Sequence, residues 1–357
     1  MVIECDKKLG EDFSLSSLSQ DFDAVCLAVG ASSAVEMNYT GSDLEGCYLG
    51  VDYLKDYVTD QQYTTGKKVA VIGGGNTAID CARTAVRAGA ETTLIYRRTR
   101  DEMPAEDYEI EEAEHEGVKF HFLTNPAENL ADENGRVKAI RLERMELGAP
   151  DASGRRSPKA TGEFFTEAFD TVIAAVSQKP DLSFMTDESL EIPLTRWNTA
   201  DVNPDTMHSG VGNIFSIGDF RRGPATAVEA VGDGRIVAQA IDRFFSGTMT
   251  QLPVKPFNSR KEKQLKAVER QQYQAIQSVA RKIMPELSAE QREQSFDEVE
   301  LGFTNADAIE EAQRCLECGC QANTQCDLRD YATEYQAVQT FNNYNVDVTD
   351  DAVWQAV

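Results

Sequence analysis

Short apolar runs and longer segments of helical periodicity alternate over the first 250 residues of the chain. Buried strands are predicted over 23–31, 69–72, 92–96, 171–176 and 213–217. Helices are predicted over 50–58, after the glycines at 73–75, and over 227–245. Strands that alternate with helices form parallel sheets with helices on their faces, and right-handed crossovers then predict a doubly wound α/β fold.

The remaining segments are predicted from weaker patterns. Residues 101–117 predict a helix with Pro104 in its first turn, where proline is tolerated. Residues 118–122, 135–147 and 163–170 alternate as strands do, and the polar segment between the last two is expected to be a hairpin loop. From about residue 256 the chain becomes charged and helical, with a long predicted helix over 261–283.

Composition limits the classes of partner. The 357 residues carry 35 Lys and Arg against 60 Asp and Glu, a net charge of −25, so nucleic acid and anionic membranes are not expected partners. No apolar run approaches the ~20 residues that span a bilayer. The N-terminus lacks the basic and apolar regions of a signal peptide, and a cytoplasmic location is expected.

A glycine turn between the strand at 69–72 and the following helix is typical of a dinucleotide site. Its pattern is G-x-G-x-x-A, in Gly73, Gly74, Gly75, Asn76, Thr77 and Ala78. Gly73 permits the tight turn, Gly75 lets a pyrophosphate approach the backbone, and Ala78 lets the helix pack closely. Free N–H groups and the helix dipole then face the phosphates. The alternative is a tight turn without a ligand.

The strand after this helix ends in Arg97 and Arg98, where an NAD-binding unit usually has an acid. Guanidinium groups there suit the 2′-phosphate of NADP, which favours charge-assisted contacts. Arg100 is a third candidate, and a solvated basic pair is the alternative. Cys81 has no second cysteine nearby and is expected to be a small buried residue rather than half of a redox pair.

A second half-site follows the strand at 213–217. Asp219 comes directly after Gly218, at the carboxyl end of a strand, where its carboxylate can accept hydrogen bonds from the ribityl hydroxyls of a flavin. Ala225, Thr226 and Ala227 begin the next helix, whose dipole would stabilise negative charge on a reduced flavin. The alternative gives Asp219 only a capping role. Trp197 is expected to pack near the flavin region.

Four cysteines lie close together in a C-x2-C-x-C-x5-C array. They are Cys315, Cys318, Cys320 and Cys326. Four thiolates in a reducing compartment can hold an iron–sulfur cluster or a zinc ion, and uncoordinated thiols are the third possibility.

Taken together, AVIGGGNTAIDCARTAVRAGA, LIYRRTRDEMPA and NIFSIGDFRRGPATAVEAVGDGR resemble the small (β) subunit of NADPH-dependent glutamate synthase and its oxidoreductase relatives. The resemblance implies an NADPH domain of the Rossmann type at 63–176. This domain would be inserted between two FAD-domain fragments, 1–62 and 177–255, and followed by a helical tail with the cysteine cluster at 256–357. In many members of that family the similar cysteine segment binds [4Fe–4S].

One departure from the family concerns FAD. The family's FAD domain begins with a glycine turn of its own, whereas this chain carries a single such turn, which by its position belongs to NADPH. We therefore expect a C-terminal portion of a longer protein, or a chain whose partner supplies the first half of the FAD domain. Weak FAD binding by the chain alone is expected, together with an exposed sheet edge or apolar patch suited to self-association.

The resemblance implies the electron-input module of an NADPH:acceptor oxidoreductase. A hydride would pass from NADPH to FAD, and electrons would leave through iron–sulfur centres or directly to a partner. No general acid or base is predicted, because the cofactors carry the chemistry. The acceptor would be a glutamate synthase large subunit, a formate dehydrogenase or a hydrogenase-like partner. The alternative is a non-catalytic docking subunit that binds a nucleotide and holds structural zinc.

Overall fold

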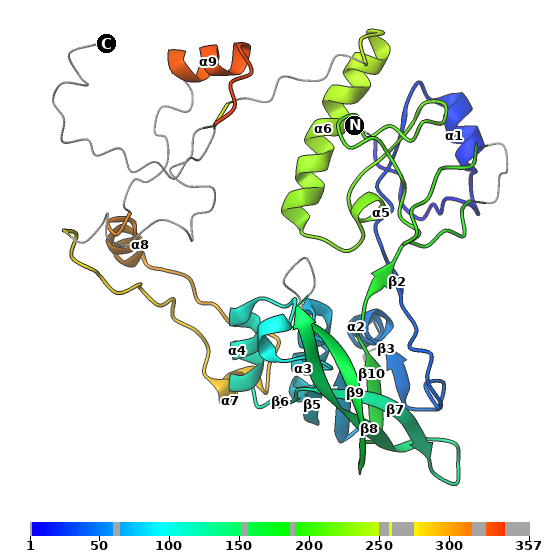
Figure 1. Cartoon of the computed structure of the whole chain (residues 1–357), viewed down its shortest axis with the longest axis vertical. Helices are drawn as coiled ribbons and strands as arrows, with labels where there is room; N and C mark the ends of the chain where they lie inside the picture. Colours follow the sequence, from blue (N-terminus) through cyan, green and yellow to red (C-terminus); the bar gives the residue numbers. More distant parts are fainter. Residues whose placement is uncertain are drawn as a thin grey trace. The chain divides into compact units, whose positions relative to one another are not determined.

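The computed structural model describes residues 2–59, 65–150, 156–185, 190–249, 257–258, 275–315 and 326–339. The chain divides into two compact units, and Figure 1 labels most of their helices and strands. The first unit comprises Met1–Gln251 with Leu287–Val299, and the second comprises Leu252–Glu286 with Glu300–Val357.

A five-stranded parallel sheet forms the centre of the predicted NADPH region. Its order is β3-β10-β4-β5-β6, so β10 returns from far along the chain to lie between β3 and β4. The strands are β3 (Cys47–Leu49), β4 (Lys68–Ile72), β5 (Glu91–Ile95), β6 (Lys119–His121) and β10 (Thr171–Ala174). The apolar runs predicted these strands because β4, β5 and β10 are buried on both faces.

Different layers cover the two faces of this sheet. One face packs against α2 (Gly50–Thr59), α3 (Asn76–Arg87) and α4 (Asp107–His115) in one apolar core. The other face packs against an antiparallel sheet of β7 (Thr124–Ala131), β8 (Val137–Pro150) and β9 (Arg156–Glu167). The α/β prediction is confirmed, but helices cover only one face, because the apolar side of β8 fills the place of a second helical layer.

The predicted FAD fragments form a smaller region with a two-stranded parallel sheet. β1 (Val25–Leu27) pairs with β12 (Ile214–Ser216). One face packs on a core that includes Leu15 of α1 (Leu15–Asp21), and the other packs on α6 (Ala227–Phe245). The chain leaves this region through β2 (Ser33–Ala34) and returns through β11 (Gln178–Lys179), and these two strands pair antiparallel.

The predicted helix over 101–117 is wrong in its first half. The chain forms a short 3-10 helix, η1 (Arg100–Glu102), then an extended stretch, and α4 begins only at Asp107. Met103 is extended, with φ −65° and ψ 131°, because the residue before a proline avoids helical geometry. Ala105 N–H then donates to Gly74 O at 3.1 Å, which holds the extended stretch against the glycine turn.

The hairpin loop predicted between residues 147 and 163 is also wrong, because the strands continue through most of it. β8 runs to Pro150 and β9 begins at Arg156, with pairs such as Glu146 with Lys159. Most residues of this outer part are exposed, so their side chains carry no apolar alternation that could have revealed the strands.

The segment Leu287–Val299 packs on the helical side of the NADPH region. It contains α7 (Ala289–Arg292), and Arg292 forms an ion pair with Glu112 of α4. The Phe296 ring lies 5.6 Å from that of Tyr57 and 5.5 Å from the Arg87 guanidinium. The segment therefore contacts α2, α3 and α4 at once.

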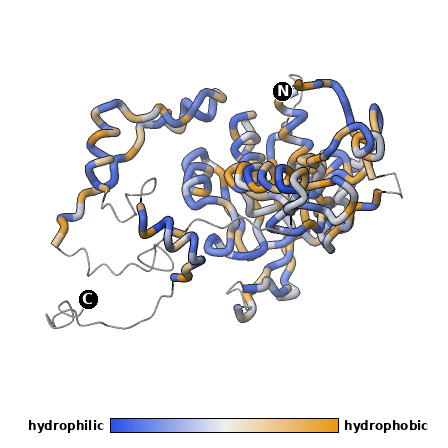
Figure 2. The backbone as a smooth tube through the Cα atoms, turned by 90° about the horizontal axis from the view of Figure 1, so that it is seen from above, coloured by the Kyte–Doolittle hydropathy of each residue, from blue (hydrophilic) through white to orange (hydrophobic). Residues whose placement is uncertain are grey.

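The second unit contains α8 (Asn305–Ala312) and α9 (Asp327–Glu334). Of the helix predicted over 261–283, residues 275–283 are not helical, and residues 261–274 lie outside the described part. Within the described ranges, no helix combines the length and the apolar character that a membrane span requires, and Figure 2 shows hydrophobic and hydrophilic residues interspersed along the chain.

Candidate functional site

The glycine turn joins β4 to α3, as predicted, and its three glycines are needed for different reasons. Gly73 has φ +150°, and a Cβ there would lie 2.2 Å from the carbonyl oxygen of Ala175. A Cβ on Gly74 would lie 2.5 Å from the ring of Tyr96. At Gly75 a Cβ would meet nothing nearer than Pro104 at 3.8 Å, and the backbone is ordinary, with φ −95°. Protein packing therefore explains Gly73 and Gly74 but leaves open space at Gly75.

The first turn of α3 presents free backbone donors beside that space. Gly75 is the N-cap and has no side chain to cap the helix. Among the described residues, no acceptor is bonded to the N–H groups of Gly74, Gly75, Asn76 or Thr77. The side chains of Asn76 and Thr77 instead accept hydrogen bonds, from Glu106 N–H at 3.2 Å and from the amide of Gln178 at 3.1 Å. Ala78 is fully buried, as close helix packing requires.

The three arginines after β5 have different surroundings. Arg97 is exposed and has no hydrogen-bond or ion-pair partner in the described parts of the chain. Arg98 is half-buried, and its Nε donates to the carbonyl oxygen of Arg156 at 2.9 Å. Arg100 pairs with Glu114 at 2.8 Å and with Glu111 at 3.5 Å. In the part of the chain that the structure describes, neither Arg97 nor Arg98 is paired with an acid, whereas Arg100 is already neutralised.

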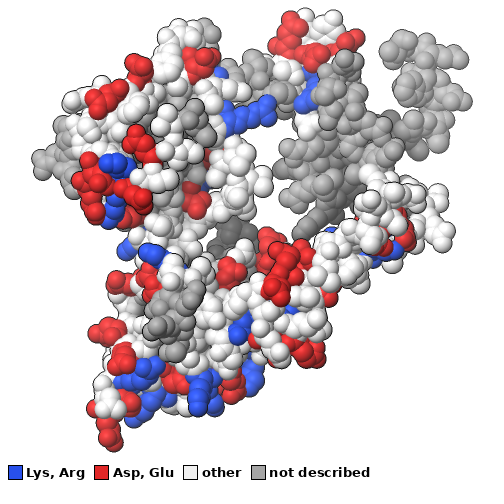
Figure 3. All heavy atoms as spheres, turned by 180° about the vertical axis from the view of Figure 1, so that it is seen from behind, with Lys and Arg blue, Asp and Glu red and all other residues white. Residues whose placement is uncertain are grey.

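Buried ion pairs join α3 to the end of α4. Glu116, just after α4, is fully buried and lies 2.7 Å from Arg83 and 2.9 Å from Arg87 of α3. Burial alone would raise the pKa of Glu116, but hydrogen bonds from Arg83 and Arg87 lower it. These pairs tie the helix that begins at the glycine turn to α4. Elsewhere Asp and Glu are spread over the surface, with smaller groups of Lys and Arg among them (Figure 3).

The second half-site is built as the pattern predicts. Gly218 has φ +62° and is the N-cap of the short helix α5 (Asp219–Arg222), so Asp219 is the first helical residue rather than the cap. In the described residues its carboxylate accepts no hydrogen bond. α6 begins directly after its N-cap, Thr226, which forms a capping box with Glu229. Ala225, Thr226 and Ala227 are all exposed.

A buried acid that sequence reasoning did not single out holds this turn together. Asp233 of α6 is fully buried, accepts from Gly218 N–H at 3.2 Å and pairs with Arg222 at 2.6 Å and with Arg221 at 3.2 Å. The hydrogen bond from Arg222 lowers the pKa of Asp233. The sequence did carry one signal of this role. Asp233 lies one helical turn after Glu229, on the face of α6 that packs against the strand.

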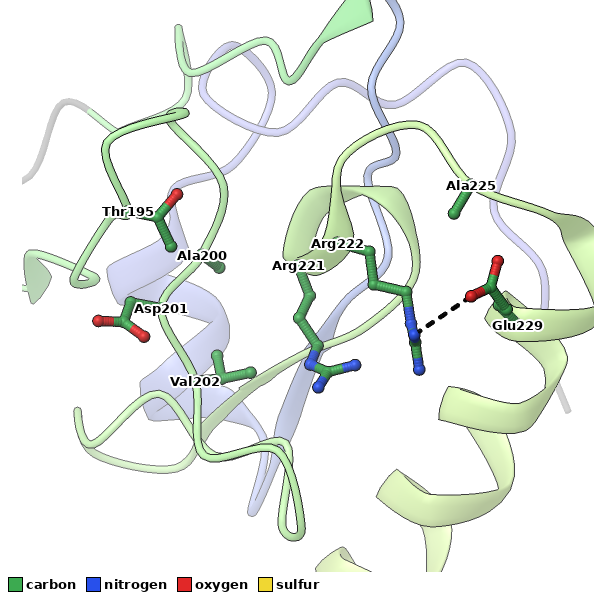
Figure 4. Close-up of a pocket in the computed structure, with 8 residues that line it drawn as sticks. All are labelled: Thr195, Ala200, Asp201, Val202, Arg221, Arg222, Ala225 and Glu229. Carbon is green, nitrogen blue, oxygen red and sulfur yellow. Dashed lines mark hydrogen bonds and ion pairs between the residues drawn. The ribbon is translucent and has the colours of Figure 1, made fainter. Parts of the chain in front are cut away.

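An open cavity of about 400 Å³ lies beside this turn. Figure 4 shows Arg221 and Arg222 between the loop that carries Thr195–Val202 and the start of α6. Of the predicted FAD residues, only Ala225 lines the cavity. Trp197, expected to pack near the flavin region, is 70% exposed and contacts Arg196 by a cation–π interaction at 4.8 Å, so its expected place stays a prediction.

Apolar side chains are exposed around the two-stranded sheet. In the described ranges β1 pairs with β12 alone, so its other edge has no partner strand. Cys26 of β1 is exposed although it lies in register with the fully buried Phe215. On α6, Val228 and Val231 are 80% and 75% exposed. An unpaired strand edge, one of the two features expected, is therefore present in the described residues, with exposed valines on α6.

The structure tests the cysteines only in part. Cys81 is fully buried and donates to Gly50 O at 3.4 Å, and burial raises its pKa, as expected for an inert thiol. Cys315 is exposed, and Cys326 is half-buried as the N-cap of α9. Cys318 and Cys320 lie outside the described residues, so the proposed metal site stays a prediction.

Comparison with known proteins identifies relatives of this architecture. The family model "Pyridine nucleotide-disulphide oxidoreductase" matches residues 4–234. The NADPH-Fe(3+) oxidoreductase subunit beta of Geobacter sulfurreducens is 38% identical over 88% of this chain and 51% of its own length. The NADP(+)-dependent formate dehydrogenase subunit beta of Moorella thermoacetica is 37% identical, over 89% of this chain and 45% of its own length.

The glutamate synthase [NADPH] small chain of Azospirillum brasilense is 36% identical over 66% of this chain and 52% of its own length. The chain thus spans about half the length of these curated relatives. Among solved structures, FprA from Mycobacterium tuberculosis in complex with NADPH is similar, with a TM-score of 0.55 and 22% identity over 69% of this chain and 70% of that one. At that identity the likeness supports the fold alone.

Proposed function

Because the chain belongs to the pyridine nucleotide-disulphide oxidoreductase family, we propose that it is the NADPH-binding, electron-input part of an oxidoreductase. The observation that carries the proposal is the glycine turn. Gly75 is required neither by its backbone angles nor by protein packing, and free amides face the space in front of it. A pyrophosphate held at a helix N-terminus explains this arrangement.

The loop after β5 supports a phosphorylated dinucleotide over NAD. Arg97 is exposed and unpartnered among the described residues, and Arg98 lies beside it. An arginine near the ribose suits the 2′-phosphate, for which guanidinium donors fit by charge and geometry. Arg100 has a lesser part in this proposal, because two glutamates already neutralise it.

The second half-site fits part of a flavin site. Asp219 offers an unbonded carboxylate at the end of β12, and the exposed start of α6 supplies the helix dipole. When both cofactors are bound, they would supply two-electron transfer from nicotinamide to flavin, and the protein residues would bind and orient them. No protein acid or base is required in this scheme. We expect weak FAD binding by this chain alone, since among the described residues β1 pairs with β12 only and its other edge has no partner strand.

Electrons would leave through a partner. The relatives are named as subunits of larger enzymes, which supports an assembly. The acceptor would be a glutamate synthase large subunit, a formate dehydrogenase or a hydrogenase-like partner. Cys315, Cys318, Cys320 and Cys326 would hold a [4Fe–4S] cluster on the way to that partner, or a zinc ion if their role is structural. The apolar patch on β1 and α6 would be covered by the other half of the FAD domain or by a second copy of the chain.

Nucleotide titration tests the proposal. We expect saturable NADP⁺ binding to the full chain in calorimetry. The double substitution Arg97→Glu plus Arg98→Glu should weaken NADP⁺ at least ~100-fold, or about 2.7 kcal/mol, and NAD⁺ less than ~3-fold. Equal losses for the two nucleotides would remove the 2′-phosphate role. No saturable binding of NADP⁺ by a folded sample would overturn the proposed function itself.

A further inference from the structure

The β8–β9 hairpin brings a residue from far along the chain onto the arginine loop. Arg98 Nε donates to the carbonyl oxygen of Arg156, the first residue of β9. Leu123, between β6 and β7, also links the hairpin to the same loop through backbone hydrogen bonds. Met145 N–H donates to Leu123 O at 2.8 Å, and Leu123 N–H donates to Arg98 O at 3.0 Å. These contacts fix Arg156 beside the proposed 2′-phosphate site, although it lies in a segment predicted to be a loop.

The side chain of Arg156 is paired with the acid that follows the arginine loop. Its Nε donates to Glu102 Oε1 at 2.5 Å, and the Glu102 side chain is only 8% exposed. Glu102 also accepts from Thr99 N–H at 3.1 Å in a capping box of η1. Both interactions hold the Glu102 carboxylate in place. A carboxylate held this close to the arginine loop would repel a 2′-phosphate unless a cation neutralises it.

The same loop reaches the glycine turn. The Tyr96 hydroxyl donates to Glu102 O at 2.8 Å, and the Tyr96 ring lies against Gly74. Arg156 therefore acts on a loop that contacts the pyrophosphate end of the proposed site as well as the arginines. About 40% of its side chain is exposed, whereas that of Glu102 is nearly buried.

We propose that Arg156 is a specificity-determining residue for 2′-phosphorylated adenine dinucleotides. It neutralises Glu102 beside Arg97 and Arg98, so that the loop keeps its positive charge. This inference rests on the proposed NADP(H) function. It differs from that function in assigning selectivity to the β8–β9 hairpin, an element outside the strand–turn–helix fingerprint.

Calorimetry on the full chain tests it, with 2′,5′-ADP and 5′-AMP as probes that share the adenosine and differ by the 2′-phosphate. Arg156→Gln should weaken 2′,5′-ADP at least ~10-fold and 5′-AMP less than ~2-fold, a selective loss of about 1.4 kcal/mol. Arg156→Lys should recover part of the loss. Adding Glu102→Gln to Arg156→Gln should recover part as well, because the unpaired acid is then removed.

Arg141→Gln is the matched control. Arg141 lies on the same hairpin, is exposed, and has its guanidinium 4.2 Å from the ring of Phe164, away from Glu102. Arg141→Gln removes one positive charge, as Arg156→Gln does, and should leave the affinities for 2′,5′-ADP and 5′-AMP unchanged. Thermal unfolding of each variant verifies folding, and Arg156→Lys carries the test if Arg156→Gln unfolds.

The outcomes separate this inference from the proposed function. Unchanged 2′,5′-ADP binding in a folded Arg156→Gln variant, or equal losses for both probes, overturns the role of Arg156 while leaving the NADP(H) site intact. Failure of Glu102→Gln to restore any affinity overturns the neutralising role. If the unaltered chain binds neither probe, the proposed function fails first.

Discussion

The NADPH region and the FAD-fragment region are built from the same kind of strand and helix but differ in how completely they are covered. The five-stranded sheet is packed on both faces, by helices on one side and by β7–β9 on the other. The two-stranded sheet of β1 and β12 leaves Cys26, Val228 and Val231 exposed. An apolar strand thus predicts a buried position only when the chain also supplies its neighbours on both sides.

The glycine turn should give the largest effects and a sharp contrast within a few residues. Gly73→Ala would place a Cβ 2.2 Å from Ala175 O, so we expect a lower melting temperature and loss of NADP⁺ binding. Gly75→Ala has open space and ordinary backbone angles, so we expect an unchanged melting temperature and at least ~10-fold weaker NADP⁺ binding, about 1.4 kcal/mol. Melting curves and calorimetry measure both. Unchanged NADP⁺ affinity in Gly75→Ala would contradict a pyrophosphate at this turn.

Removal of the buried acid in the NADPH region should come next in size. Glu116→Gln leaves Arg83 and Arg87 without their shared partner, so we expect the free energy of unfolding to fall by ~3–5 kcal/mol. Denaturant unfolding at neutral pH measures the change. Glu111→Gln serves as the control, because Glu111 is 61% exposed and its pair with Arg100 is long, at 3.5 Å. Equal effects of the two changes would mean that burial does not strengthen the network.

Truncation of apolar side chains compares the two regions directly. Ile79→Ala removes a fully buried side chain from α3 and should cost ~2–5 kcal/mol in unfolding free energy. Val231→Ala removes a side chain of α6 that is 75% exposed and should change the stability of the isolated chain by less than ~0.5 kcal/mol. If a partner or a second copy of the chain covers α6, Val231→Ala should become costly in that assembly. A large cost in the isolated monomer would show that α6 is already covered.

The pH dependence should be the smallest effect. Because the folded-state pKa of Glu116 is lowered, its contribution is present above the ordinary glutamate value of 4.5 and is lost as the pH falls through the folded-state pKa. The difference in unfolding free energy between the unaltered chain and Glu116→Gln should therefore shrink between pH 7 and pH 3. Denaturant unfolding at several pH values checks this. A constant difference would contradict an ionised Glu116 in the native protein.

Local patterns in the sequence were sufficient for the elements that carry the predicted cofactor sites. The strand before Gly73, the helix after Gly75 and the turn at Gly218 were all predicted, because their apolar runs and glycines act within a few residues. The prediction failed at Pro104 and in the β8–β9 hairpin. Near Pro104, a backbone hydrogen bond from Ala105 N–H to Gly74 O decided the conformation. In the hairpin, pairing between solvent-exposed parts of β8 and β9 decided it.

The sequence by itself determined the α/β alternation, the glycine turn and the two arginines after β5, since each depends on neighbouring residues and on backbone angles. Only the tertiary structure decided which charges are free. Arg100 is neutralised by α4, Asp233 binds Arg221 and Arg222, and Arg156 reaches Glu102 from another sheet. Such pairings join residues of different elements, 11 to 54 positions apart in the chain, and their distances are set by how the elements pack.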